Sequence, residues 1–190
     1  MAIRNNENNV IEKTDFSGKI LTKQEFENCS FTGCNFSNSD LSNSGFTDCT
    51  FDSCNFSLAK IKNTALKDVK FRNCKLLGLN FNECNKFLLL IDFEDCLLNL
   101  ASFFNLRLKN TKFINCSLQE VDFAEADLSN SLFDKCDFNR AIFEHTVLEK
   151  ADFRTSFNYS IDPELNRIRK ARFSLAGIAG LLEKYGIEIE

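Results

Sequence analysis

Nine cysteines and a single histidine are the residues of this chain whose chemistry could build a reactive or metal-binding site. In the stretch from Phe26 to Phe36, Cys29 and Cys34 stand five residues apart, a separation also found in some iron–sulfur loops. Three interpretations are open: a metal site, a disulfide framework, or small residues that fill a core. A metal site needs ligands that converge from several directions, with His or Asp partners, and His145 stands alone.

The cysteines follow a repeat that runs through most of the chain. Steps of five from Phe16 lead to Phe81, and steps of five from Leu88 lead to Phe153; all fourteen positions of each run are Phe, Leu or Ile. The step between the runs is seven, so the register slips by two residues. All nine cysteines lie two residues before such a position, counting the continuation of the first run, in a class shared with Ala, Ser, Thr and Val. A period of five fits neither an α-helix nor a flat strand.

This pattern resembles the pentapeptide-repeat family, whose consensus is A(D/N)LXX. Residues 126–130 (ADLSN) and 151–155 (ADFRT) match it almost letter for letter, and the resemblance covers residues 14–157. It implies an all-β solenoid, a right-handed quadrilateral β-helix of about seven to eight coils, with four pentapeptides to each coil of 20 residues. The central and the small residues would point inward, because each coil can bury a core only against its neighbours.

In such a solenoid the cysteines would be small buried packing residues, and we expect no metal or cofactor. Residues 20 apart would stack in columns. We therefore expect two separate thiol columns, one before and one after the register slip, formed by Cys34, Cys54 and Cys74 and by Cys96, Cys116 and Cys136.

The repeat pattern predicts a single domain with five sections. These are an N-terminal tail or cap (1–13), a first β-helix section (14–83), a register break (84–87), a second β-helix section (88–157), and a last irregular coil followed by a helix (158–190).

The C-terminal segment predicts a short capping α-helix that ends at Gly186. Its apolar residues follow the i, i+3, i+4, i+7 pattern of one helix face: Ile178, Leu181, Leu182 and Tyr185. The segment LLEKYGI resembles the C-terminus of the Qnr-type group of pentapeptide-repeat proteins. That resemblance implies a homodimer formed through this helix. It also implies a DNA mimic that binds DNA gyrase or topoisomerase IV and modulates quinolone sensitivity.

Two stretches are candidates for interaction surfaces. The acidic candidate surface comprises Glu120, Asp122, Glu125, Asp127, Asp134 and Asp137. The apolar candidate interface, near the register slip, comprises Phe87, Leu89, Leu90, Leu97, Leu100 and Phe104. A basic band with six Lys or Arg against Asp68 covers residues 60–75.

Opposite charges recur one coil apart and should face each other between adjacent coils, as cross-strand pairs do. The predicted pairs are Asp40/Lys60, Asp52/Arg72, Asp92/Lys112, Arg107/Asp127, Glu120/Arg140 and Asp134/Arg154.

Composition argues against several classes of function. The formal net charge of −4 disfavours direct nucleic-acid binding, and no apolar run is long enough to span a membrane. With no apolar leader segment, we expect a cytoplasmic protein. No enzyme signature is present, so we expect no catalytic residues. Two functions stay open: a topoisomerase-binding DNA mimic, and a scaffold that binds another protein through an apolar or charged face.

Overall fold

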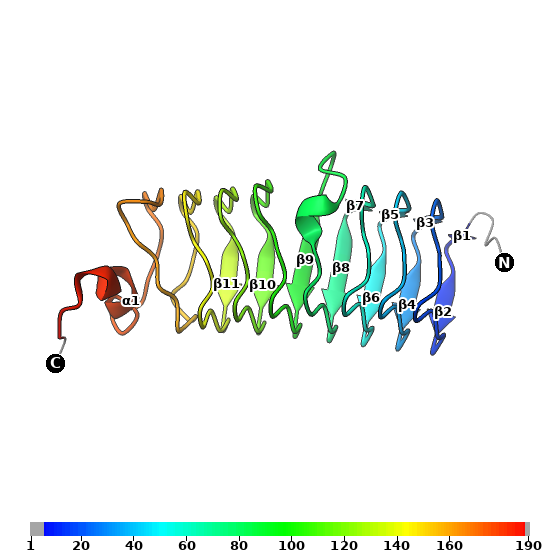
Figure 1. The fold of residues 1–190 in the computed structure, drawn as a ribbon, viewed down its shortest axis with the longest axis horizontal. Coiled ribbons are helices and arrows are strands. Elements are labelled where there is room, and N and C mark those ends of the chain that lie inside the picture. The colour runs from blue at the N-terminus through cyan, green and yellow to red at the C-terminus, as the bar shows by residue number, and fades with distance from the viewer. Residues whose placement is uncertain (1–5, 189–190) are drawn as a thin grey trace.

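The computed structural model describes residues 6–188, which form a stack of coils with the chain ends at opposite ends of the stack (Figure 1). All strand pairs are parallel and belong to two sheets. The four-stranded sheet has the order β1 (Asn6–Glu7), β3 (Glu25–Glu27), β5 (Gly45–Thr47), β7 (Ala65–Lys67). The seven-stranded sheet has the order β11 (Leu132–Asp134), β10 (Lys112–Ile114), β9 (Ile91–Glu94), β8 (Val69–Arg72), β6 (Thr50–Asp52), β4 (Ser30–Thr32), β2 (Val10–Glu12). The helical elements are η1 (Phe81–Glu83), α1 (Ala179–Leu182) and η2 (Glu183–Tyr185).

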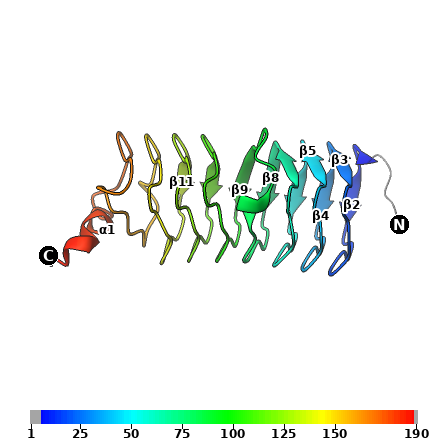
Figure 2. The same ribbon diagram turned by 45° about the horizontal axis from the view of Figure 1, so that its top comes forward.

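The coils have four faces, which we number along the chain. Face 1 is the seven-stranded sheet and its continuation through Asp152 and Arg172. Face 2 holds the bridged column from Asp15 to Phe157, and face 3 the column from Ile20 to Ile142. Face 4 is the four-stranded sheet and its continuation through residues 107–167. Figure 2 shows β3 and β5 along one edge of the coils and β2 and β4 below them.

Stacked phenylalanines fill the interior. Phe113 lies between Phe93 and Phe133, with ring centroids 5.0 Å away on both sides, and all three side chains are fully buried. Rings of neighbouring faces meet edge to face, as for Phe103 and Phe113 at 5.9 Å. The predicted quadrilateral β-helix with a short C-terminal helix is confirmed. Because β1 and β2 pair with β3 and β4, residues 6–13 belong to the first coil and not to a tail; residues 1–5 of that predicted section lie outside the described residues.

The turns explain a second regularity of the sequence. Nearly every repeat has a residue with positive φ two positions after its central residue, and Asn is the most common residue there. Asn and Gly adopt this left-handed conformation more easily than other residues. One position before the central residue, an Asp or Asn side chain often accepts a hydrogen bond from the backbone N–H two residues later, as Asp40 does from Ser42 (3.0 Å). The D/N of the repeat consensus is therefore a turn-stabilising residue.

The small inward residues also have a hydrogen-bonding role that the sequence analysis missed. The thiol of Cys74 donates to the carbonyl of Phe51 (3.4 Å), and the hydroxyl of Thr64 donates to the carbonyl of Leu41 (2.9 Å), in both cases 23 residues back. Asn166 donates to the carbonyl of Phe143 and accepts from the N–H of Thr146. The position two residues before the central residue therefore favours small side chains that can donate a hydrogen bond, since a buried carbonyl left without a hydrogen bond is costly.

All nine cysteines are buried thiols, as predicted. They do not form two separate columns, however. The bridge between Lys75 and Leu97 places Cys96 directly after Cys74, so one column continues through the register slip.

We predict that none of the nine thiols reacts rapidly with a disulfide reagent at pH 8 in the folded protein. All nine side chains are buried and inaccessible to the reagent. For Cys49 and Cys84, burial also raises the pKa to about 11, so these two thiols carry almost no thiolate at pH 8. Titration with Ellman's reagent should give nine equivalents only after unfolding in guanidinium. One or more equivalents reacting at once in buffer would contradict this.

The register slip lies between Asn85 and Ile91. Asn85 still pairs with Ala65, 20 residues back, whereas Ile91 pairs with Val69, 22 residues back. Leu88 was expected to be the first inward residue of the second run; this is wrong, because Leu88 is 62% exposed and has a φ of 57°. Leu89 instead packs against the core. The two extra residues form the loop that projects from the stack beside η1 (Figure 1).

Candidate functional site

The residues of the acidic candidate surface do not lie on one face. Asp134 is in β11 on face 1, Asp137 on face 2, Asp122 on face 3 and Asp127 on face 4. The remaining two are exposed in the turns before and after face 3, at positions with positive φ: Glu120 and Glu125. These carboxylates therefore encircle the rod and do not form a contiguous patch.

Several of these carboxylates are already hydrogen-bonded within the stack. Asp137 accepts from Gln119 (2.6 Å) and Asn158 (2.8 Å). Asp127 accepts from the N–H of Ser129 (3.1 Å) and pairs with Lys109 (3.1 Å). Partial burial works against ionisation of both carboxyls, but these hydrogen bonds outweigh it, and the pKa of each is lowered. Both side chains thus stabilise the rod itself through hydrogen bonds within and between its coils.

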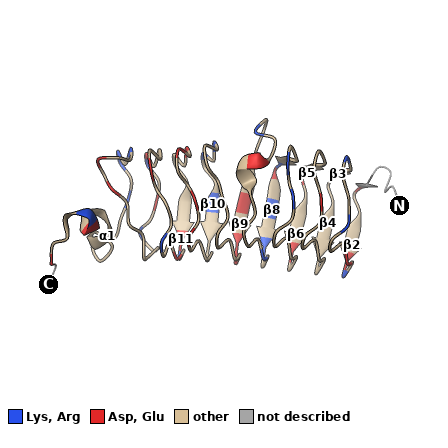
Figure 3. Cartoon of the chain, in the orientation of Figure 1, with Lys and Arg blue, Asp and Glu red and all other residues tan. Residues whose placement is uncertain are grey.

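Charges alternate along face 1 from strand to strand. Lys70 of β8, Asp92 of β9 and Lys112 of β10 are neighbours in one column, and Figure 3 shows the change from basic to acidic to basic. The two residues of each predicted charge pair lie in adjacent coils, as expected. Among the described residues, however, only Glu120 and Arg140 form a predicted ion pair (3.9 Å). Arg72 pairs with Glu94 (3.1 Å) on the other side and not with Asp52.

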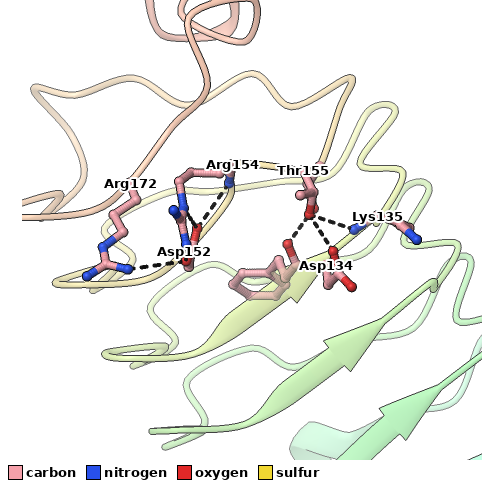
Figure 4. Close-up of polar contacts among 8 residues, drawn as sticks. Asp134, Lys135, Asp152, Arg154, Thr155 and Arg172 are labelled. Carbon is pink, nitrogen blue, oxygen red and sulfur yellow. Dashed lines mark hydrogen bonds and ion pairs between the residues drawn. The ribbon is translucent and has the colours of Figure 1, made fainter.

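The C-terminal part of face 1 shows why the observed ion pairs differ from the predicted ones. Arg154 binds Asp152 (2.8 Å), two residues before it, and Arg172 approaches the same carboxylate (3.6 Å; Figure 4). Asp134 instead accepts a hydrogen bond from the hydroxyl of Thr155. The same hydroxyl oxygen accepts a hydrogen bond from the backbone N–H of Lys135. A long side chain can reach a residue of its own coil as easily as one in the next.

We predict that Asp152→Asn lowers the free energy of unfolding by no more than about 1 kcal/mol at pH 7, since Arg154 is largely exposed and Asn can still accept the hydrogen bond from its backbone N–H. The hydrogen bond from Arg154 lowers the pKa of Asp152. The charge therefore stabilises the fold fully above about pH 4, the unfolded value, and the effect is lost as the pH falls through the lowered pKa. Thermal unfolding measured from pH 7 to pH 2 should show the difference in Tm between the variant and wild type becoming smaller. A difference in Tm that grows in acid would contradict this.

The apolar candidate interface is also divided among faces. Phe87 and Leu90 are exposed in the slip loop, which begins on face 4. Leu97 lies in the column of face 2, and Leu100 in the turn that follows it. Phe104 follows the core residue Phe103 on face 3, and Leu89 is partly buried. Residues close in sequence thus point in different directions.

The predicted C-terminal helix is shorter than expected but ends where predicted. α1 and η2 follow each other directly, and Gly186 closes them with a φ of 60°. Leu181 packs against the core, whereas Ile178 and Tyr185 are 40% and 55% exposed. Lys184 ties the segment to the last coil through Asp162 and Glu164 (2.7 Å each). A groove of about 590 Å³ is lined by Ala179, Gly180, Leu182, Glu183, Gly186 and Ile187.

Within residues 6–188, no three His, Cys, Asp or Glu side chains are grouped so that they could hold a metal ion. In the same range, no helix has the length and apolar character needed to cross a membrane.

The family model described as pentapeptide repeat region matches residues 24–103, and the model described as pentapeptide repeats (8 copies) matches residues 116–154. This chain belongs to the pentapeptide-repeat family. A trypsin-treated variant of QnrB1, a plasmid-mediated fluoroquinolone resistance protein, superposes with a TM-score of 0.64 and 18% identity over 97% of this chain and 99% of that one. A second trypsin-treated variant gives 0.62 and 19%, over 97% of both chains. No curated protein matched the chain. At these identities the likeness shows the family's fold.

Proposed function

We propose that this chain is a non-enzymatic binding protein that docks on DNA gyrase or topoisomerase IV, as the Qnr-type resemblance implies. The observation that carries the proposal is the likeness in fold to QnrB1 over nearly the whole of both chains. A rod with a phenylalanine-filled interior offers surface for binding another protein. A topoisomerase partner would place the protein in the cytoplasm.

The rod carries far less negative charge than duplex DNA, so we propose that it docks on the enzyme by its shape more than by its charge. Duplex DNA carries about one negative charge per 1.7 Å of axis. Residues 14–157 carry 20 acidic and 16 basic side chains, and many of the acids serve turns or ion pairs. Among the acidic candidates, Glu120 and Glu125 are the exposed ones. We propose that these two turns face the basic DNA-binding surface of the enzyme.

The test is a supercoiling assay with purified gyrase, with and without a quinolone. The proposal predicts inhibition of supercoiling or protection from the drug, in a dose-dependent manner. The variant Glu120→Gln/Glu125→Gln should be weaker, while Glu27→Gln, at an exposed glutamate of β3 near the N-terminal end of the rod, should match wild type. Neither inhibition nor protection over a wide range of concentrations would end the proposal for that enzyme.

We also propose a homodimer formed through the C-terminal segment. Ile178 and Ile187 are exposed there beside the apolar groove, and Leu175 is 87% exposed. Exposed apolar patches of this kind indicate an interface.

We predict that Ile178→Asp converts the dimer to a monomer in sedimentation equilibrium, because the dimer would bury an unpaired carboxylate. The matched control is Ile20→Asp, a substitution at a 79% exposed isoleucine near the other end of the rod, which should stay dimeric. A wild-type protein that is monomeric at 100 µM (about 10⁻⁴ M, a weak affinity) would refute the dimer.

A further inference from the structure

One turn of the coil carries leucines where the rest of the rod has polar residues. Leu58, Gly78 and Leu100 occupy this turn, between faces 2 and 3, in three consecutive coils. The backbone shows this directly, because their N–H groups donate to the carbonyls of Leu77, Asn99 and Gln119, each in the next coil. Asn38 precedes them in the column and Glu120 follows, so the apolar part is bounded at both ends.

The two leucines are unfavourable in two independent ways. Among the non-glycine residues with positive φ within residues 6–188, only Leu58, Leu88 and Leu100 are apolar. A left-handed backbone is poorly tolerated by leucine, whereas Asn, used elsewhere at this position, adopts it more easily. In addition, Leu58 is 62% and Leu100 61% exposed to solvent. Neither the backbone nor the core gains from leucine at these positions, and the two exposed side chains are available for a contact outside the rod.

Neighbouring side chains extend the leucines into a ridge. Leu97 is 43% exposed in the adjoining column of face 2, and Leu77 lies half-buried beside Gly78. Gly78 leaves a notch between the leucines, over which Leu58 leans: its Cδ2 lies 3.1 Å from the place of a Cβ on Gly78. We call this set the leucine ridge: Leu58, Leu77, Leu97 and Leu100.

Lysines border the ridge on both sides. Lys75 is bridged to Leu97 on face 2, and Lys60 follows Leu58 on face 3. Lys62 is exposed on the same face. Within residues 6–188, Lys62 and Lys75 take part in none of the ion pairs. An apolar strip flanked by available ammonium groups is complementary to a segment with an apolar stripe and flanking carboxylates.

We propose that the leucine ridge is a docking surface for an acidic amphipathic segment of another protein. Such a segment would place its apolar side chains against Leu58 and Leu100, and its carboxylates near Lys62 and Lys75. The ridge adjoins the acidic turn at Glu120, which follows Leu100 in the same column. The two proposals are distinguished by their variants, because Leu58→Asn/Leu100→Asn keeps both glutamates and Glu120→Gln/Glu125→Gln keeps both leucines.

The first test separates a binding role from a folding role. Leu58→Asn/Leu100→Asn should raise Tm by about 2–4 °C, because it relieves two unfavourable backbone conformations. Asn38→Leu, the reverse change in the same column, should lower Tm. A lower Tm for the double variant would show that the leucines support the fold and would overturn the proposal.

The second test measures binding by fluorescence anisotropy. The probe is a labelled 14-residue helical peptide with Leu at positions 3, 7 and 10 and Glu on the flanks (one apolar stripe). The controls are the same peptide with Lys for Glu and a scrambled acidic peptide. Wild type should bind the acidic amphipathic peptide at least tenfold more tightly than either control, and Leu58→Asn/Leu100→Asn should lose this preference. Equal binding of the three peptides, or no effect of the double variant, would overturn the proposal.

A second copy of the chain is the competing occupant. In the Ile178→Asp background, the account predicts no association that depends on the ridge. A concentration-dependent dimer that disappears in Leu58→Asn/Leu100→Asn would assign the ridge to self-association and overturn the proposal.

Discussion

Replacing Phe113 with alanine is expected to lower the free energy of unfolding by about 3–5 kcal/mol. The side chain is fully buried and stacks between Phe93 and Phe133, with edge contacts to Phe103 and Phe123. In a stack where each coil contacts only its neighbours, a cavity at the centre weakens two interfaces at once. Urea titration followed by circular dichroism measures the loss.

The control is Phe16→Ala, near the N-terminal end of the rod in the column of face 2. Phe16 stacks on Phe36 alone (4.9 Å) and is 8% exposed, so we expect a loss of roughly 2 kcal/mol. Equal losses at the two positions would contradict the one-dimensional view of the fold.

Replacing Gly180 with valine is expected to detach the C-terminal segment from the last coil. A Cβ at Gly180 would overlap the carbonyl oxygen of Tyr159, a backbone atom with little freedom to move. The carbonyl of Gly180 also accepts the N–H of Ile161 (2.9 Å), so the two backbones are held together. We expect the variant to lose about 3 kcal/mol of local stability and its dimer.

Hydrogen exchange at residues 158–173 measures this detachment, and sedimentation measures the dimer. Gly186→Asn is the control in the same segment, because its φ of 60° suits Asn and its Cβ would meet open space. A Gly180→Val protein with wild-type protection in the last coil would contradict the packing described here.

The period of five, through the resemblance to the pentapeptide-repeat family, was sufficient to predict the fold and the burial of every cysteine. In this fold, one bulky and one small side chain in each five residues enter the interior. The left-handed turns could also have been predicted, from the Asn and Gly that recur two positions after the central residue. The hydrogen bonds of the thiols could not, because they depend on which carbonyl a turn leaves unpaired.

The acidic and apolar candidate surfaces were grouped by sequence proximity, which differs from spatial proximity in this fold. A step of 20 residues keeps a side chain on its face, whereas a step of five moves it to the next face. Residues 120–137 therefore pass almost once around the coil. The inward prediction for Leu88 was wrong for a different reason. Five apolar residues in a row, 87–91, compete for the interior. Periodicity cannot show that Leu89 and Ile91 enter it while Leu88 does not.

The leucine ridge was accessible only from the structure. The sequence places Leu58 and Leu100 in different repeats on either side of the slip, with 42 residues between their numbers. Only the continuous register across β8 and β9 shows that they belong to the same column.

The central claim, that the rod occupies the DNA-binding surface of a topoisomerase, is tested most directly by competition. Purified gyrase and the labelled protein are mixed, and duplex DNA is titrated into the complex. The account predicts saturable binding that DNA displaces completely, with weaker binding for Glu120→Gln/Glu125→Gln. No binding, or binding that saturating DNA leaves unchanged, would contradict it.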